Sequence, residues 1–341
     1  MIRLVRGLSI AIAAAFAAPC AQAAWPDDRP IEIIVGYQPG SGPDILARRM
    51  APAMAKYLGP KVSFVVTNRA GASGEIALTA VSRAEPNGYT IGTLTTPSFI
   101  IIEHVKKPQY DPAAIVPLAR VIDDPTLIAA SDLGFTRDRP LMCAHRQQPM
   151  CDGTSPLKDL RDLVGRVKAN SGSVSIGHNG IGTNGHLATL AIERAAGARL
   201  IDVPFKGTSE SRTALLGGHV DLVAMSVSEF VMDREATGLF KALAQLGPAR
   251  TPTLPEVPTA RDLGFDIEIS TERGFAVRHG VAPDIIERLQ NAIAAAVTDP
   301  EFLRGTTSDE LAVAYLSGPD WTKSMAERKA RYEAMWGAGV K

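Results

Sequence analysis

Strands that end in glycine-bearing loops and lead into helices recur along this chain of 341 residues. The first unit opens with the β-branched segment Ile31–Val35, which predicts a buried strand, followed by a loop from Gly36 to Asp44. Apolar residues at helical spacing from Leu46 onward predict the helix that completes it. This order is typical of a mostly parallel α/β sheet, which binds ligands outside the carboxyl ends of its strands.

Later segments repeat the order and extend it into a second set that begins near Leu127. Strands are predicted at residues 62–66, 89–94, 174–177, 200–205 and 220–224, and helices at 76–84, 157–168, 186–196, 284–297 and 320–335. Pro52 is expected to kink or shorten the first helix, because proline lacks an N–H and crowds the preceding turn. The proline-rich stretch 247–258 is predicted to be a crossing segment.

The amino terminus has the pattern of a secretory signal peptide. Arg3 and Arg6 precede the uncharged apolar run Leu8–Ala18, and Ala21-Gln22-Ala23 supplies a small-x-small cleavage site. The run is too short to span a bilayer of about 30 Å as a helix. We therefore expect residues 1–23 to be cleaved and the mature chain to reside in the periplasm.

Cysteines Cys143 and Cys151 remain after cleavage of residues 1–23, and export makes them candidates for a disulfide bond. Their spacing across a polar segment favours a local disulfide in an oxidising compartment. A metal site that includes His145, or two free thiols, are the alternatives.

The overall charge and the absence of known motifs narrow the function. Thirty-six basic residues balance thirty-six acidic ones, so the sequence shows no electrostatic footprint for nucleic acid. There is no Gly-x-Ser-x-Gly elbow, His-Glu-x-x-His, P-loop or dinucleotide fingerprint. We expect a monomer that is not an enzyme and that uses no cofactor or metal ion.

Three loops between a strand and a helix predict an anion site. They are residues 39–42, 71–74 and 182–185, each rich in glycine, with Ser41, Ser73, Thr183 and Asn184 as short side-chain donors. The first N–H groups of a helix lack intrahelical partners and lie at the positive end of its dipole, so they bind anions. Together the loops favour a ligand with a carboxylate or similar anionic group.

Three other residues have two interpretations each. His186 begins a helix after a glycine loop, where it either hydrogen-bonds an anion or steadies the loop. Asp44 either orients a catalytic pair or accepts N–H bonds near its helix start. Lys206 either faces the ligand crevice or forms a salt bridge in solvent.

In its ordered motifs the chain resembles the Bug-type periplasmic receptors of tripartite tricarboxylate transporters. The motifs cover nearly the whole mature chain and include Asn68-Arg69-Ala70-Gly71-Ala72-Ser73-Gly74, Ala84-Glu85-Pro86-Asn87-Gly88-Tyr89-Thr90, Gly180-Ile181-Gly182-Thr183-Asn184-Gly185-His186-Leu187, Val203-Pro204-Phe205-Lys206-Gly207 and Gly217-Gly218-His219-Val220-Asp221.

The resemblance implies a two-lobed periplasmic-binding-protein fold that closes on a small organic carboxylate. Residues 24–126 with 247–341 would form the first lobe and 127–246 the second, with an insertion at about 137–154. The implied partner is the membrane permease of a tripartite transporter; a membrane sensor and, less favoured, an enzyme on the same scaffold are the alternatives. The candidate ligand-binding residues are Tyr37, Pro39, Gly40, Ser41, Asp44, Ser73, Thr95, Thr96, Gly182, Thr183, Asn184, Gly185, His186 and Lys206.

Three departures from the family pattern bear on the identity of the ligand. Ser41 replaces a glycine of the first loop, and the charged pair Glu272-Arg273 stands where an aromatic residue is usual. Ser226 lies where many relatives have an acidic residue, which leads us to expect a ligand other than an amino acid.

Overall fold

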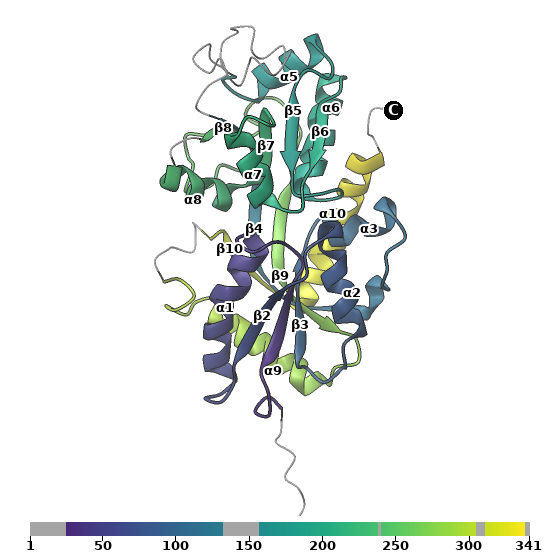
Figure 1. Cartoon of the computed structure of the whole chain (residues 1–341), viewed down its shortest axis with the longest axis vertical. Helices are drawn as coiled ribbons and strands as arrows, with labels where there is room; N and C mark the ends of the chain where they lie inside the picture. The colour runs from purple at the N-terminus through teal and green to yellow at the C-terminus, as the bar shows by residue number, and fades with distance from the viewer. Residues whose placement is uncertain (1–24, 132–156, 238–239, 305–310, 338–341) are drawn as a thin grey trace, which may run out of the picture.

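The computed structural model describes residues 25–131, 157–237, 240–304 and 311–337 (Figure 1). The predicted signal peptide, the insertion at 137–154 and the cysteines Cys143 and Cys151 lie outside the described residues. No helix in the described ranges combines the length and apolar character that a membrane span requires.

Ten strands and nine α-helices make up the described part of the chain. The strands are β1 (Ile31–Val35), β2 (Phe64–Asn68), β3 (Thr90–Thr95), β4 (Ile115–Ser131), β5 (Ser175–His178), β6 (Ile201–Pro204), β7 (Leu222–Ser226), β8 (Phe240–Gln245), β9 (Ser270–Arg278) and β10 (Val313–Ser317). The helices are α1 (Gly42–Leu58), α2 (Glu75–Arg83), α3 (Ser98–Val105), α5 (Leu160–Ala169), α6 (Asn184–Ala196), α7 (Thr208–Leu216), α8 (Val227–Thr237), α9 (Pro283–Ala296) and α10 (Gly318–Gly337).

The strands form two lobes that share one long strand, β4 (Figure 1). In the first lobe the order is β2-β1-β3-β9-β4, with β10 also paired to β4. In the second lobe the order is β4-β7-β5-β6, with β8 paired to β4. The first half of β4 pairs with β9 from Ile115 to Pro125, and its second half pairs with β7 and β8. Strand β4 therefore runs from one lobe into the other, and we call its crossing point the hinge.

Each lobe has a mixed sheet that combines parallel and antiparallel pairs. Within each lobe, the neighbours of β1 and of β5 run parallel to them. Strand β4 is antiparallel to every strand it pairs with, and β3 is antiparallel to β9. These antiparallel pairs come from the crossing strands, which the local alternation did not predict.

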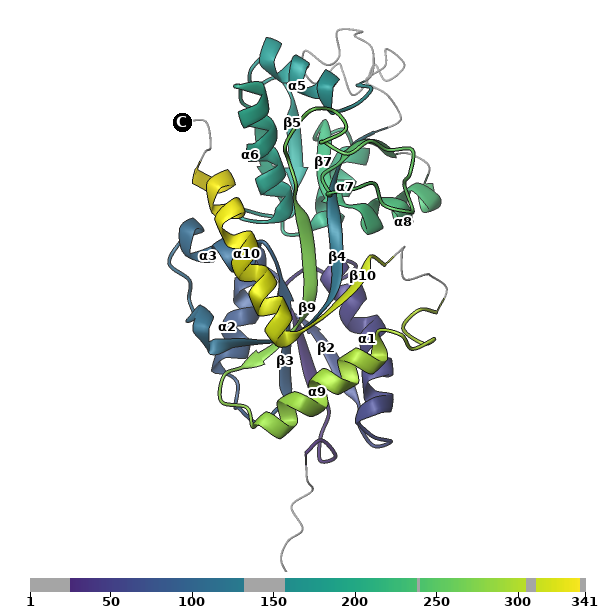
Figure 2. The ribbon, with the colours of Figure 1, turned by 180° about the vertical axis from the view of Figure 1, so that it is seen from behind.

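Helices cover both faces of each sheet, which buries the strands on both sides (Figures 1 and 2). In the first lobe α1 and α9 cover one face, and α2, α3 and α10 cover the other. In the second lobe α5 and α6 cover one face, and α7 and α8 the other. Helix α10 extends from the first lobe toward α6, where the rings of Trp336 and His186 lie 5.2 Å apart.

Two local expectations differ from the structure. Pro52 lies inside α1, which continues to Leu58, so the prediction of an early end is wrong. Proline at this position costs only the bond to the Arg48 carbonyl, and Arg48 lies on the exposed side, where water can bind that carbonyl. Within the proline-rich stretch 247–258, Leu254 and Val257 pack into the core beneath α8 in the second lobe.

Candidate functional site

Three helices begin where the two lobes face each other. Helix α1 starts after Ser41 in the first lobe, and α6 and α7 start after Thr183 and Gly207 in the second. None of the three N-cap residues makes a side-chain capping bond within its helix. The first N–H groups of α6 and α7 are therefore not taken by a side-chain cap, and the positive ends of these two helices face the space between the lobes.

Asp44 holds the loop that precedes α1. Its buried carboxylate accepts hydrogen bonds from the Gly40 N–H at 2.9 Å, Asn68 Nδ2 at 2.8 Å and Arg48 Nε at 3.0 Å. Burial would raise the pKa of Asp44, but these bonds outweigh burial and lower it. Of its two predicted roles, the contacts match an acceptor of N–H bonds near the helix start.

Tyr37 and Ser73 connect this loop to the second lobe. The buried Tyr37 hydroxyl donates to the Ser73 carbonyl at 3.0 Å, and burial raises its pKa. Ser73 Oγ donates across the lobes to the Ile181 carbonyl at 2.6 Å. A pocket of about 370 Å³ lies here, lined by Ser73, Asn179 and the exposed Lys206 among others.

The loop before α6 is held by its own polar groups. Thr183 Oγ1 donates to the Gly180 carbonyl at 2.7 Å, and Asn184 Nδ2 donates to Thr126 Oγ1 on β4 at 3.0 Å. The Gly182 N–H donates to His186 Nδ1 at 3.3 Å, so His186 contributes to the shape of this loop. The contacts fix the start of α6 against the hinge strand.

His178, His186 and Asp202 form the group with metal-ligand spacing among the described residues, with ligand atoms within 4.8 Å of one another. Hydrogen bonds account for their arrangement: His178 Nε2 lies 2.5 Å from Asp202 Oδ1, and His186 Nδ1 accepts from Gly182. That acceptor role leaves the proton of His186 on Nε2, which would have to leave for Nε2 to bind a metal. Burial, and then the neighbouring His178, lower the pKa of His186 to about 4, which Asp202 opposes.

Four buried polar residues, Asp124, Ser226, Glu229 and Arg273, form what we call the cleft cluster. Arg273 on β9 donates to Asp124 Oδ2 at 3.0 Å and to Ser226 Oγ at 2.7 Å, and its NH2 lies 3.9 Å from Glu229 Oε1. Glu229 Oε1 also accepts the Gly42 N–H at 3.1 Å, so a second-lobe carboxylate occupies the start of α1. A Cβ on Gly42 would lie 2.6 Å from the Arg273 guanidinium carbon, so a larger residue here would displace that guanidinium.

Several buried polar atoms at the cleft cluster and at the helix starts of the second lobe have no hydrogen-bond partner within the described residues. In the first lobe they include Ser41 Oγ, Thr95 Oγ1, Thr271 Oγ1 and Arg273 Nε; in the second they include Asn179 Oδ1 and Ser209 Oγ. Thr95 pairs with Arg273 in the register of β3 and β9, so their side chains leave the same face of the sheet. Buried polar groups almost always have partners, so this set is suited to bind a polar molecule between the lobes.

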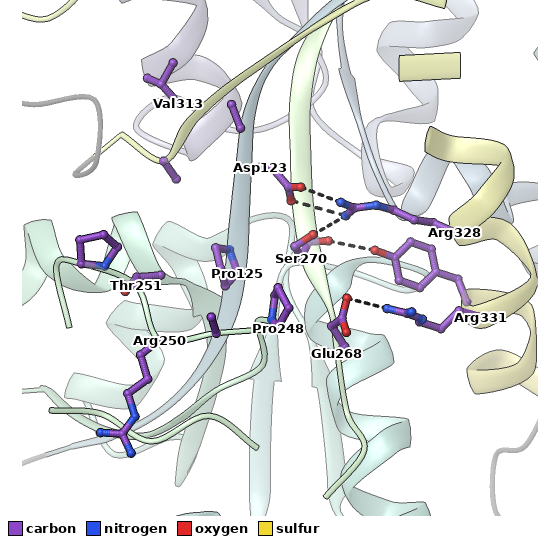
Figure 3. A pocket seen from close by; sticks show the side chains of 15 residues that line it. Asp123, Pro125, Pro248, Arg250, Thr251, Glu268, Ser270, Val313, Arg328 and Arg331 are labelled. Carbon is purple, nitrogen blue, oxygen red and sulfur yellow. Dashed lines mark hydrogen bonds and ion pairs between the residues drawn. The ribbon is translucent and has the colours of Figure 1, made fainter. Parts of the chain in front are cut away.

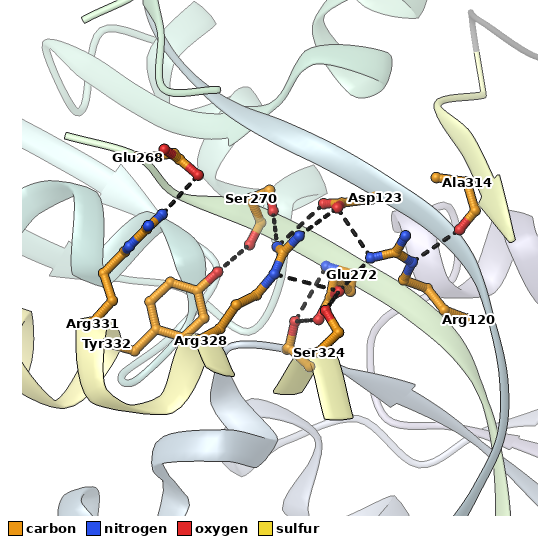
Figure 4. A network of polar contacts seen from close by, with 11 residues as sticks. Arg120, Asp123, Glu268, Ser270, Glu272, Ala314, Ser324, Arg328, Arg331 and Tyr332 are labelled. Carbon is orange, nitrogen blue, oxygen red and sulfur yellow. Dashed lines mark hydrogen bonds and ion pairs between the residues drawn. The ribbon is translucent and has the colours of Figure 1, made fainter. Parts of the chain in front are cut away.

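The opposite face of β9 carries a second set of charges, the hinge network of Arg120, Asp123, Glu272 and Arg328 (Figure 4). Glu272 Oε1 accepts from Arg120 NH1 at 2.6 Å, and Asp123 Oδ2 accepts from Arg328 NH2 at 2.6 Å. A pocket of about 340 Å³ lies beside it, between the first-lobe helix α10 and the 248–252 segment (Figure 3).

The predicted residues therefore separate into distinct places. Ser41 and Thr95 lie beside the cleft cluster, and Thr183 to His186 form the facing helix start. Thr96 instead points to the hinge network, where its Oγ1 donates to Glu272 Oε2 at 3.1 Å. Pro39 and Lys206 are exposed at the rim.

Sequence reasoning missed Asp124 and Glu229, and it noted Arg273 only as a departure from a family pattern. For Arg273 a signal was available, because the charged pair Glu272-Arg273 lies inside a buried strand. Glu229 reaches Gly42 across 187 positions of sequence, and no local pattern indicates such a contact.

Comparison with known proteins gives a consistent result. A sequence profile of the family described as "Tripartite tricarboxylate transporter family receptor" matches residues 46–338. Protein BugT of Bordetella pertussis is 30% identical over 328 residues, which are 95% of this chain and 93% of the relative. The structure of periplasmic binding protein BugD is 27% identical, with a TM-score of 0.76 over 92% of this chain and 99% of that one. An R. palustris protein solved with adipate shares the fold at 23% identity, with a TM-score of 0.78 over 92% of this chain and 98% of the other.

Proposed function

Because this chain belongs to the tripartite tricarboxylate transporter family receptors, we propose that it captures a small carboxylate between its lobes in the periplasm and delivers it to a membrane permease. The predicted signal peptide supports export, and the two-lobed fold supports capture.

The observation that carries this proposal is the convergence of helix starts and unpartnered polar atoms. The N–H groups at the start of α6 face the first lobe, where Ser41 Oγ and Thr95 Oγ1 lie buried with no partner among the described residues. Helix N-termini bind carboxylates without needing a paired arginine. A solute with one carboxylate on α6 and a polar far end on the first lobe would contact both lobes at once.

Contact with both lobes gives the receptor its mechanism. The lobes are joined through β4 and β9, and the polar contacts between them include Ser73 to Ile181, Gly42 to Glu229 and Arg273 to Ser226. A ligand that touches both lobes binds the closed arrangement more tightly than an open one, so it shifts the equilibrium toward closure. The solute leaves chemically unchanged in this proposal.

Thermal unfolding with and without candidate solutes tests the capture. A carboxylate present at about 100 times its dissociation constant adds about 2.7 kcal/mol to the free energy of unfolding. The matched control is the corresponding uncharged amide, which should add far less. Equal stabilisation by acid and amide, or none by any carboxylate, would refute capture through the carboxylate.

Uptake of a labelled solute tests the delivery. Cells that lack this chain should lose uptake of the solute that stabilises the purified protein, and re-expression should restore it. Unchanged uptake would assign the captured solute to a membrane sensor instead.

A further inference from the structure

The cleft cluster carries more negative than positive charge. Arg273 is its one cation among the described residues, and it faces two carboxylates, Asp124 at 3.0 Å and Glu229 at 3.9 Å. All three side chains are at most 5% exposed, so water screens them little. With all three ionised, the cluster holds one negative charge in excess.

Neighbouring basic side chains bond to groups outside the cluster. Arg49 lines a small pocket with Glu229 and Arg273, but its guanidinium donates to the Phe302 and Arg304 carbonyls. Arg212 pairs with Asp233 at 3.0 Å, and Arg48 pairs with Asp44 at 3.0 Å. Burial raises the pKa of the Asp124 carboxyl, Arg273 and Ser228 oppose the rise, and Glu229 adds to it. Even if Asp124 holds a proton, the charge of the cluster rises only to zero, so the cluster itself offers no surplus positive charge to an incoming anion.

The cluster lies within reach of a ligand bound at α6. Asn184, the first residue of α6, bonds to Thr126, and Thr126 is the register partner of Ser226 on β7. Ser226 accepts from Arg273. Adjacent strands lie about 5 Å apart, so the start of α6 is about 10 Å from the cluster. A chain of a few carbons can span that distance, which places the far end of the ligand at the cluster.

We propose that the cleft cluster selects solutes that carry a single carboxylate with a protonated amino group at the far end, and selects against dicarboxylates. The proposal rests on the proposed function, because it takes α6 as the site of the carboxylate. A second carboxylate at the cluster would meet buried negative charge, whereas an ammonium group would complete the charge balance. The hydroxyls of Ser41, Thr95 and Thr271 can accept its N–H bonds.

The surroundings of Ser226 reverse the expectation drawn from that residue. The absence of an acid at that position predicted a ligand other than an amino acid, but Ser226 lies between two acids from elsewhere in the chain. Its Oγ and Glu229 both bind the Arg273 guanidinium region, and its N–H donates to Glu229 Oε2 at 3.2 Å. Asp124 on β4 and Glu229 on α8 supply the negative charge instead.

Isothermal titration calorimetry on the purified mature protein tests the proposal with pairs of equal length. The pairs are succinate with 4-aminobutanoate, glutarate with 5-aminopentanoate, and adipate with 6-aminohexanoate. In the pair whose length fits, the amino acid should bind at least about tenfold more tightly than the dicarboxylate. A dicarboxylate that binds as tightly as its partner, or more tightly, overturns the proposal and leaves carboxylate capture intact. Failure of all six solutes to bind overturns this proposal as well, whereas carboxylate capture is refuted only if no carboxylate stabilises the protein in thermal unfolding.

The variant Glu229→Gln identifies the source of the preference. It removes one negative charge and keeps the size and a hydrogen-bond acceptor for Gly42, so the ratio of the two affinities should fall by about tenfold. The matched control is Glu256→Gln, an exposed glutamate paired with Arg234 outside the cleft, which should leave the ratio unchanged. An unchanged ratio in Glu229→Gln, with normal circular dichroism, refutes the role of the cluster.

Discussion

Two charged clusters flank the same strand, β9, and differ in what they join. Glu272 and Arg273 are neighbours in sequence, but their side chains leave opposite faces of the sheet. The hinge network around Glu272 lies within the first lobe, and Arg120 and Arg328 each reach both of its acids, Asp123 and Glu272. The cleft cluster around Arg273 spans both lobes, and unpartnered polar atoms surround it. From this difference we propose that the hinge network stabilises the fold and that the cleft cluster binds the ligand.

The largest expected effect comes from breaking the hinge network. Glu272→Gln removes a fully buried carboxylate and leaves Arg120 and Arg328 with Asp123 alone, so the free energy of unfolding should fall by about 3–5 kcal/mol. Urea denaturation measures the loss, and titration with the bound solute should show unchanged affinity. If Glu272→Gln alters affinity more than Arg273→Gln does, the division between the two faces is wrong.

An intermediate effect on stability is expected from pH, through His186 in the second lobe. The pKa of His186 is about 4 in the folded protein and 6.5 in the unfolded chain, so the unfolded chain takes up the proton first as pH falls. This contribution to stability is complete above pH 6.5 and is lost as pH falls toward 4, a change on the order of 3 kcal/mol. Denaturation curves across this range should show the loss, and His186→Gln should remove it. Parallel pH profiles for the two proteins would contradict the assignment.

The smallest effect distinguishes a ligand-binding hydroxyl from a structural one. Ser41 Oγ has no partner among the described residues, whereas Ser175 Oγ donates to Asp221 at 2.6 Å, and both serines are buried. Ser41→Ala should therefore change stability by less than about 0.5 kcal/mol and weaken solute binding by about 1 kcal/mol. Ser175→Ala should lower stability by about 1–2 kcal/mol with affinity unchanged. The reverse pattern, measured by denaturation and calorimetry, would remove Ser41 from the site.

Local patterns predicted the parts of the fold that local chemistry determines. The strand at Ile31–Val35 was predicted with its observed bounds, and the glycine-rich loops do lead into α1 and α6. Such loops can be predicted because a few adjacent residues, glycines above all, determine the backbone conformation of a turn. The same reasoning located Ser41 and Thr183 at helix starts.

The crossing strands β4 and β9 were missed because charges interrupt their apolar pattern. Arg120, Asp123 and Asp124 read as a polar break in the segment 115–131, yet they are buried or partly buried within a 17-residue strand. Burial is possible because Glu272, Arg273 and Arg328, about 150 to 205 positions away, supply the opposite charges. Such pairing is a tertiary property, so a single sequence read locally does not reveal it.

A crystal structure of the protein with its tightest-binding solute tests the central claim most directly. We predict a carboxylate within hydrogen-bond distance of the N–H groups at the start of α6, with the far end of the solute beside Ser41, Thr95 and the cleft cluster. A solute bound instead in the pocket behind β9 (Figure 3), or on one lobe alone, would contradict it.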